Sequence, residues 1–140
     1  MIVRFSNTFD LPIDHVFSYF RSPADWVRLY GIAGDVIPYP DGWIGVPLHR
    51  FPFPLIAKNT DLIANEVVRW TFRGFWKGQG EVRFTQTDQG VLVQGYEQIS
   101  ARWLFFLSPI VEALFLRRQF EAIWELGWRR LRKQEIRPVP

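Results

Sequence analysis

Hydrophobic side chains follow a helical spacing over the last long segment of the chain, from Ser108 to about Gln134. Ser108 is a favourable N-cap residue, and Pro109 fits the first helical position, where its missing N–H costs no hydrogen bond. On a helical wheel, one broad face is formed by Ile110, Ala113, Leu114, Leu116, Phe120, Ile123, Trp124, Gly127, Trp128 and Leu131. The pattern therefore predicts an amphipathic helix about 40 Å long.

Two charged residues, Arg117 and Glu121, lie near the middle of this apolar face. Because they are one turn apart, they can form an ion pair beneath a neighbouring loop. The alternative is that the face borders a cavity into which both charges point, since an unpaired buried charge needs a partner or water. Both interpretations stay open at this point.

Before that helix, the hydrophobic pattern has a shorter period. Residues 2–9 alternate as a first strand, and two short helices follow it, beginning at Pro12 and at Ser22. The run Ser22-Pro23-Ala24-Asp25 has the form of a capping box, and Gly31 ends the second helix. Two short helices are therefore predicted directly after the first strand.

Between residues 32 and 100 the pattern predicts strands and turns alone. The expected strands are 35–39, 43–51, 55–63, 67–73, 81–87 and 91–100. In the last hairpin, Val82 and Phe84 are expected to share a face with Tyr96, while Phe75 and Trp76 are expected at an aromatic loop tip. Together these elements predict an α+β fold, with a curved antiparallel sheet of about six to seven strands wrapped around the long C-terminal helix.

Composition narrows the class of protein. The chain has 140 residues, 48% of them hydrophobic, with 7 Trp and 13 Phe. We expect a single domain over residues 1–140, in which these rings form either a bulky core or the wall of an apolar pocket. The net charge of +3 gives no reason to expect nucleic acid as a partner.

Targeting signals and disulfides are not expected. The chain has no cysteine, and its N-terminus, MIVRFSNTFDLP, lacks the apolar run of a signal peptide. No apolar stretch reaches the roughly 20 residues that a membrane span needs. We therefore expect a cytoplasmic protein.

The sequence contains no motif that is typical of a metal or cofactor site. The two histidines, His15 and His49, are far apart in sequence, and no phosphate-binding glycine motif opens a helix. We expect no metal and no cofactor. His15 is expected at the surface or as a cap, whereas His49 lies on a predicted strand with Trp43 and Phe51, and a place inside a pocket is its alternative role.

Several short segments, in this order, resemble the START-like superfamily of helix-grip proteins, also called SRPBCC. They are Leu11-Pro12-Ile13-Asp14-His15-Val16-Phe17, Ser22-Pro23, Trp26, Gly42 to Gly45, Glu66-Val67-Val68-Arg69-Trp70 and the terminal helix. The superfamily includes polyketide cyclases/dehydratases and lipid-transfer domains. The resemblance implies an apolar cavity between the sheet and the long helix, and it leaves the activity open.

The ligand expected in such a cavity is small and apolar, either lipid-like or an aromatic polycyclic. Its candidate contacts are Trp26, Tyr30, Trp70, Phe72, Phe84, Tyr96, Arg117, Phe120, Glu121 and Trp124. These rings equally fit a solid core, so both interpretations stay open. The alternative function is an enzyme of the cyclase/dehydratase kind, with Glu121 as base and Tyr96, His49 or Arg117 polarising a carbonyl group.

Partners other than a ligand are also open. The basic end of the terminal helix complements the helix dipole, or it draws the protein transiently to anionic lipid, with apolar tips at 51–55, 75–76 and 103–107 touching the bilayer. A third function is a module that contacts another protein through exposed aromatic residues. Either a monomer or a homodimer is compatible with the sequence.

Overall fold

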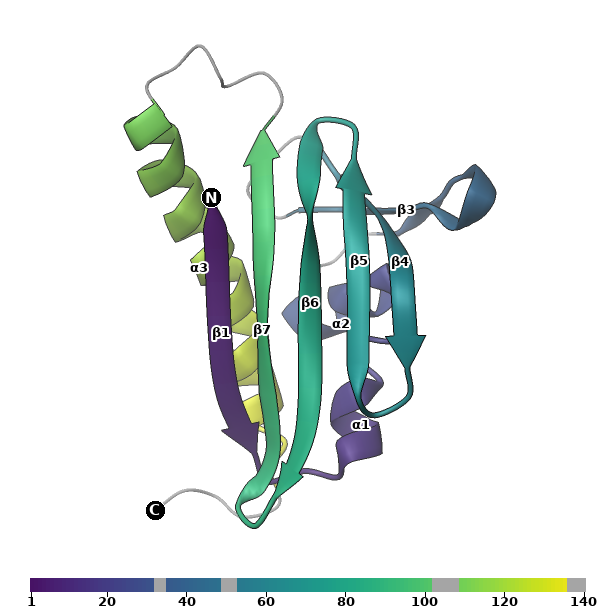
Figure 1. Ribbon diagram of the computed structural model, residues 1–140, viewed down its shortest axis with the longest axis vertical. Helices are drawn as coiled ribbons and strands as arrows, with labels where there is room; N and C mark the ends of the chain where they lie inside the picture. Colours follow the sequence, from purple (N-terminus) through teal and green to yellow (C-terminus); the bar gives the residue numbers. More distant parts are fainter. Residues whose placement is uncertain (32–34, 49–52, 102–108, 136–140) are drawn as a thin grey trace.

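The computed structural model describes residues 1–31, 35–48, 53–101 and 109–135. Within these ranges the strands form one antiparallel sheet in the order β1-β7-β6-β5-β4-β3-β2 (Figure 1). The strands are β1 (Ile2–Phe9), β2 (Ile37–Pro38), β3 (Ile44–Val46), β4 (Leu55–Ile63), β5 (Val67–Arg73), β6 (Trp76–Thr87) and β7 (Gly90–Ala101). The helices are α1 (Ile13–Phe17), α2 (Trp26–Tyr30) and α3 (Pro109–Arg132), with 3-10 turns η1 (Pro23–Asp25) and η2 (Pro40–Gly42).

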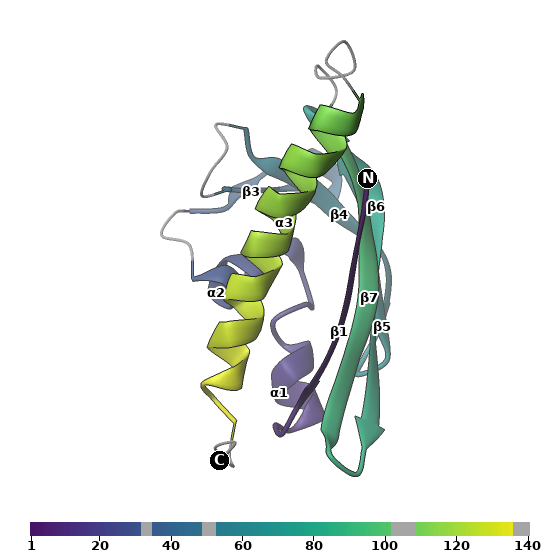
Figure 2. The same ribbon diagram turned by 90° about the vertical axis from the view of Figure 1, so that its left-hand side faces the viewer.

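The helices lie on one side of the sheet, and the sheet curves toward them. Figure 2 shows α3 running along this side, with α1 and α2 beside it and β3 turned toward the helices. The α+β helix-grip fold, with two short helices after the first strand, is therefore confirmed. The predicted strand 35–39 is shorter than expected, and so is 43–51, whose residues 49–51 lie outside the described residues.

The inner face of the sheet is set by strand alternation. In β5, Val68, Trp70 and Phe72 are buried, and the same parity buries Val82 and Phe84 in β6. Because paired residues of antiparallel strands point to the same face, the buried residues form rows across the sheet. This apolar surface is what the helices cover.

The last hairpin differs from the prediction at two residues. In β7 the odd-numbered residues point inward, and Val91, Val93 and Ile99 among them are buried. Tyr96 therefore lies on the outer face, paired with Glu81. Strand β6 begins at Trp76, which is 1% exposed instead of lying at a loop tip. The reason is that β6 continues past its glycines and pairs with β7 as far as Ala101.

Helix α3 packs through a regular stripe of large residues. Its buried residues, within the part whose side chains are described, are Leu116, Phe120, Ile123, Trp124, Gly127, Trp128 and Leu131. Gly127 permits close approach to α2, because a Cβ there would lie 3.0 Å from the Cγ of Leu29. The predicted apolar face is thus confirmed over the second half of the helix.

The first half of α3 corrects the helical wheel. Leu114 is 58% exposed, and Arg117 and Glu121 are both exposed. Figure 1 shows the first turns of α3 lying beyond the edge strand β1, so this flank of the helix has no strand beneath it. The wheel assumed that one face is covered along its whole length, and the tilt of α3 across the sheet breaks that assumption.

Candidate functional site

A row of inward residues crosses the middle of the sheet. Asn59 of β4 pairs with Trp70, Trp70 with Gly80, Gly80 with Glu97, and Glu97 with Val3. Gly80 leaves room above β6, and the Trp70 indole fills it: a Cβ at Gly80 would lie 2.5 Å from Trp70 Nε1. The indole of Trp70 therefore reaches across β6, which separates it from the strand that carries Glu97.

Helix α2 faces this row from the other side. Its residues Trp26 and Tyr30 are spaced i,i+4 and so share one face of the helix, and both are buried. The ring centroids of Trp26 and Trp70 are 5.1 Å apart, and Tyr30 meets Trp124 of α3 edge-on at 5.7 Å. We call Trp26, Tyr30, Trp70, Glu97 and Trp124 the Glu97 cluster.

Glu97 is the one charged residue that is buried as a whole among the described residues, at 2% exposure. Burial raises its pKa to about 8, although a hydrogen bond from the Trp124 side chain acts in the opposite direction. Burial, and then the charge of Glu97, raise the pKa of the Tyr30 hydroxyl well above its usual value. At neutral pH the cluster therefore holds a protonated carboxyl group beside a neutral phenol.

Three buried polar atoms of the described residues have no hydrogen-bond partner: Trp26 Nε1, Trp70 Nε1 and Asn59 Oδ1. Trp70 and Asn59 are neighbours in the row that contains Glu97, and Trp26 packs on Trp70. Buried polar groups are normally paired, because leaving one unpaired costs about 1–3 kcal/mol. The two unpaired indoles thus pack on each other, and Asn59 lies on the next strand of the same row.

Most of the predicted ligand contacts are buried on the helix-facing side. These are Trp26, Tyr30, Trp70, Phe72, Phe84, Phe120 and Trp124. They do not all meet: Phe84 packs with Phe17 and Phe20, and Phe120 packs on Trp76. The structure thus places Tyr30 and Trp124 next to Glu97. Trp70 lies in the same row of the sheet, and Trp26 packs on Trp70.

Three predicted contacts are not in this interior. Tyr96 lies on the outer face of the sheet, and Arg117 and Glu121 are exposed on α3. Their expected position facing an interior cavity was wrong, for the reasons of strand parity and helix tilt given above. His49, the other catalytic candidate, lies outside the described residues.

Sequence reasoning missed Glu97, although a signal for it exists. Val91, Val93, Glu97 and Ile99 share one parity, which is the buried one. A glutamate in line with inward valine and isoleucine residues indicates a buried carboxyl group. Tyr96 was predicted to contact the ligand because it is aromatic. The alternation along β7 instead places its neighbour Glu97 on the buried face.

A groove of about 290 Å³ runs between β1 and α3, next to the cluster. It is lined by Val3, Arg4, Phe5, Ser6, Asn7, Glu121, Trp124, Glu125 and Trp128. Val3 is paired with Glu97, and Trp124 belongs to the cluster. Phe5 and Trp124 stack at 4.7 Å between ring centroids, so aromatic rings separate this groove from the interior.

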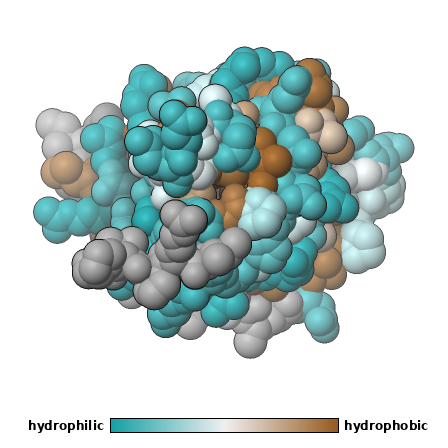
Figure 3. Space-filling view, turned by 90° about the horizontal axis from the view of Figure 1, so that it is seen from below, coloured by the Kyte–Doolittle hydropathy of each residue, from teal (hydrophilic) through white to brown (hydrophobic). Residues whose placement is uncertain are grey.

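A second groove, of about 400 Å³, lies between α1 and the turn that joins β4 to β5. It is lined by Asp14, Phe17, Arg21, Leu62, Ala64 and Asn65. This end of the molecule is drawn in Figure 3, where hydrophobic surface is visible near the middle, surrounded mostly by hydrophilic side chains. No buried unpaired polar atom lines this groove, so we do not count it as the site.

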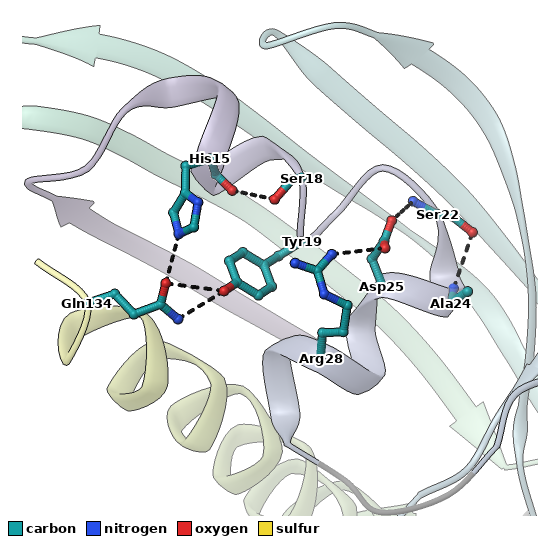
Figure 4. Close-up of polar contacts among 8 residues, drawn as sticks. All are labelled: His15, Ser18, Tyr19, Ser22, Ala24, Asp25, Arg28 and Gln134. Carbon is teal, nitrogen blue, oxygen red and sulfur yellow. Dashed lines mark hydrogen bonds and ion pairs between the residues drawn. The ribbon is translucent and has the colours of Figure 1, made fainter.

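His15 has a structural role at the same end. Its Nε2 lies 2.7 Å from Gln134 Oε1, and the Tyr19 hydroxyl also bonds the Gln134 side chain (Figure 4). Arg28 lies over the Tyr19 ring at 4.7 Å and pairs with Asp25. These contacts connect the segment around α1 and α2 to the end of α3.

Within the described part of the chain, no group of His, Cys, Asp and Glu residues is arranged to hold a metal ion. Among the helices described here, none combines the length and apolar character that crossing a membrane requires.

Comparison with known proteins supports the fold. No family model matches the chain, and no curated protein matches it. Solved structures do: protein MLL2253 from Mesorhizobium loti has a TM-score of 0.69 at 8% identity, covering 95% of both chains. DR_A0006 from Deinococcus radiodurans matches with a TM-score of 0.65 at 15% identity, covering 97% of this chain and 98% of the other.

A third similar structure is the Aha1 dimer from Colwellia psychrerythraea, with a TM-score of 0.67 at 10% identity, covering 100% of this chain and 99% of that one. At such low identities the likeness concerns the fold alone. The chain therefore has the sheet-and-helix fold of these proteins, which is a helix-grip fold.

Proposed function

We propose that the protein binds a small, largely apolar molecule between the sheet and α3, with the polar end of that molecule at the Glu97 cluster. The observation that carries the proposal is the pair of unpaired, buried indole N–H groups, Trp26 Nε1 and Trp70 Nε1. Trp70 lies in the cross-strand row that contains the buried Glu97, and Trp26 packs on Trp70. A ligand that pairs with these groups would remove the cost of leaving them unpaired. The surrounding rings supply apolar contact area.

The family assignment is part of this proposal. The sequence resembles START-like, or SRPBCC, helix-grip proteins, and the fold agrees with that resemblance. A ligand held between sheet and long helix is what the resemblance implies. The similar solved structures support the architecture and leave the ligand to experiment.

Native mass spectrometry of the purified protein tests the proposal. We expect a fraction of molecules to carry an apolar compound that organic extraction releases. The Glu97→Leu variant, which removes the carboxyl group, should lose most of this compound, whereas Glu66→Leu, at an exposed position in the turn before β5, should retain it. Protein that is free of any adduct and shows no thermal shift with apolar probes would contradict binding.

A second function follows from the pKa of Glu97, which burial raises to about 8. A carboxyl group that is protonated at neutral pH can act as a general acid toward a carbonyl oxygen, as a cyclase/dehydratase-type enzyme requires. Glu97 would take the catalytic role that the sequence suggested for Glu121. In that case Glu97→Gln abolishes turnover of a bound substrate while its affinity stays within about twofold.

The predicted contact with a lipid bilayer has less support in this structure than in the sequence. Of the apolar tips expected to touch lipid, Trp76 and Leu55 are buried, while Phe53 is 45% exposed and stacks on Phe75. Membrane contact, a protein partner and the choice between monomer and homodimer stay predictions. Sedimentation with phosphatidylserine vesicles and light scattering would test them.

A further inference from the structure

We infer that the ligand presents an uncharged hydrogen-bond acceptor, a carbonyl group, to donors from Trp26, Trp70 and Glu97. This inference rests on the proposed function and specifies the chemistry of the ligand's polar end. It is carried by the kinds of polar atoms that are left unpaired and by where the fold places them.

The unpaired nitrogen atoms of the two indoles are donors. An indole nitrogen can only donate a hydrogen bond, so Trp26 Nε1 and Trp70 Nε1 each require an acceptor. Trp70 Nε1 sits above Gly80, whose partner on the next strand is Glu97. An acceptor for the Trp70 N–H would therefore lie at the edge of the indole that reaches across β6 toward the strand of Glu97.

Glu97 can complete the donor set. The Trp124 side chain already hydrogen-bonds the carboxyl group, which engages part of its accepting capacity. Because burial keeps the group protonated at neutral pH, its O–H is available as a donor. A ligand hydroxyl could also accept from the indole N–H groups, but its own O–H would need a further acceptor, whereas a carbonyl group only accepts.

The charges of the described residues argue for an uncharged acceptor. Among these residues no lysine or arginine is buried, so none of them stands ready to neutralise an anionic ligand there. Burying an unpaired anion costs far more than burying a neutral carbonyl. A ketone, ester or similar group therefore fits better than a carboxylate or phosphate.

Asn59 Oδ1 is the one unpaired acceptor in the row, and it lies on the far side of Trp70 from Glu97. Three strand spacings separate Asn59 from Glu97, or roughly 14 Å along the row. One ligand group cannot contact both. Asn59 is thus placed to accept from a second, distant group of a longer ligand.

A matched set of probes tests the inference: 2-acetylnaphthalene, 2-ethylnaphthalene and 2-naphthoate. The first two share the naphthalene ring and a two-carbon substituent and differ in the carbonyl oxygen, and the third replaces the neutral acceptor with an anion. We expect 2-acetylnaphthalene to bind at least tenfold more tightly than either of the others at pH 7. Its bound C=O stretch should also lie at a lower frequency than in alkane solvent, which reports hydrogen bonding directly.

Variants assign the donors. Trp70→Phe and Trp26→Phe remove an N–H group and keep an aromatic ring, so each should weaken 2-acetylnaphthalene binding about three- to tenfold and leave 2-ethylnaphthalene unchanged. Trp43→Phe is the matched control, because its ring contacts Lys58 and Arg73 away from the cluster. It should alter neither affinity.

The outcomes separate the inference from the proposed function. Equal affinity for the acetyl and ethyl probes, or tighter binding of 2-naphthoate, would overturn the inference while leaving apolar binding intact. Failure of all the probes to bind would overturn the binding proposal itself. If Trp70→Phe and Trp26→Phe lower stability without changing selectivity, their N–H groups serve the fold, for example through aromatic faces, and the donor assignment is wrong.

Discussion

At the scale of single residues, Glu97 is the feature that departs most from ordinary core composition. A carboxyl group with 2% exposure is retained among valines and tryptophans, and burial raises its pKa to about 8. Its counterpart on the outer face is Glu81, which forms ion pairs with Arg69 and Arg83. The two glutamates give opposite pH dependences of stability.

The pH dependence of unfolding should show the effect of Glu97. Its folded pKa of about 8 lies above the usual 4.5, so the unfolded chain releases the proton first and stability falls as pH rises between these values. Glu97→Gln should remove this loss. In urea unfolding, the free energy of the variant relative to the natural chain should rise by up to about 1.4 kcal/mol per pH unit.

Glu81→Gln serves as the control with the opposite sign. Burial alone would raise the pKa of Glu81, but hydrogen bonds and charge from Arg69 and Arg83 outweigh it and lower the pKa. Its contribution is therefore present above its unfolded pKa and is lost as the pH falls through the folded pKa. Identical pH profiles for the natural chain and Glu97→Gln would contradict the buried, protonated carboxyl group.

Gly80 should not tolerate a methyl group. A Cβ there would lie 2.4 Å from the indole of Trp70, which is only 1% exposed. We expect Gly80→Ala to lower the free energy of unfolding by about 1–3 kcal/mol and to change the tryptophan near-ultraviolet circular dichroism. In a Trp70→Leu background the penalty should shrink, because the colliding ring is gone. An unchanged penalty there would exclude the ring contact as its cause.

At the scale of elements, α3 shows how a helix can match its predicted period and still expose part of its apolar face. Its second half covers the sheet and α2, while its first turns extend beyond β1 (Figure 1). Leu116 is 2% exposed and Leu114 is 58% exposed, although the wheel placed both on the core side. The tilt of the helix determines which of the two leucines is buried.

These two leucines form a matched pair for mutagenesis. Leu116→Ala leaves a cavity and should cost about 2–5 kcal/mol, whereas Leu114→Ala should change stability by less than about 0.5 kcal/mol. Arg117→Ala and Glu121→Ala should likewise have small effects, because both side chains are exposed. Chemical denaturation measures all four. A large loss in Leu114→Ala would mean that α3 is covered along its full length.

At the scale of the whole molecule, the Glu97 cluster draws on segments far apart in sequence. Helix α2, strands β5 to β7 and helix α3 each contribute to it. A ligand at the cluster would therefore stabilise all of them together. That residues 1–140 form a single domain, and that the protein is cytoplasmic, stay predictions.

Hydrogen exchange with bound 2-acetylnaphthalene tests this common stabilisation. At a free concentration 100 times its dissociation constant, the probe should raise the free energy of unfolding by about 2.7 kcal/mol. Amide protection should increase in α2, β5 to β7 and α3. The turn joining β4 to β5, where Leu62 and Ile63 are exposed, should change little. Protection confined to that turn would place the probe in the groove beside α1 instead.

The sequence by itself determined the order and type of the elements. Alternation identified β4 and β5 at their observed bounds, the Ser22 capping box marked η1, and helical spacing identified α3. These features depend on neighbours within a few residues of one another, which is why local patterns could predict them. The buried parity of β7 was equally present in the sequence, and it would have indicated Glu97.

The tertiary structure alone decided which candidates form a site. Pairing across β5, β6 and β7 brings Trp70, Gly80 and Glu97 into one row, and packing of α2 and α3 adds Trp26, Tyr30 and Trp124. The same packing leaves Arg117 and Glu121 exposed. Burial of a side chain depends on which elements cover it, and strand register and helix tilt settle that only when the whole chain is folded.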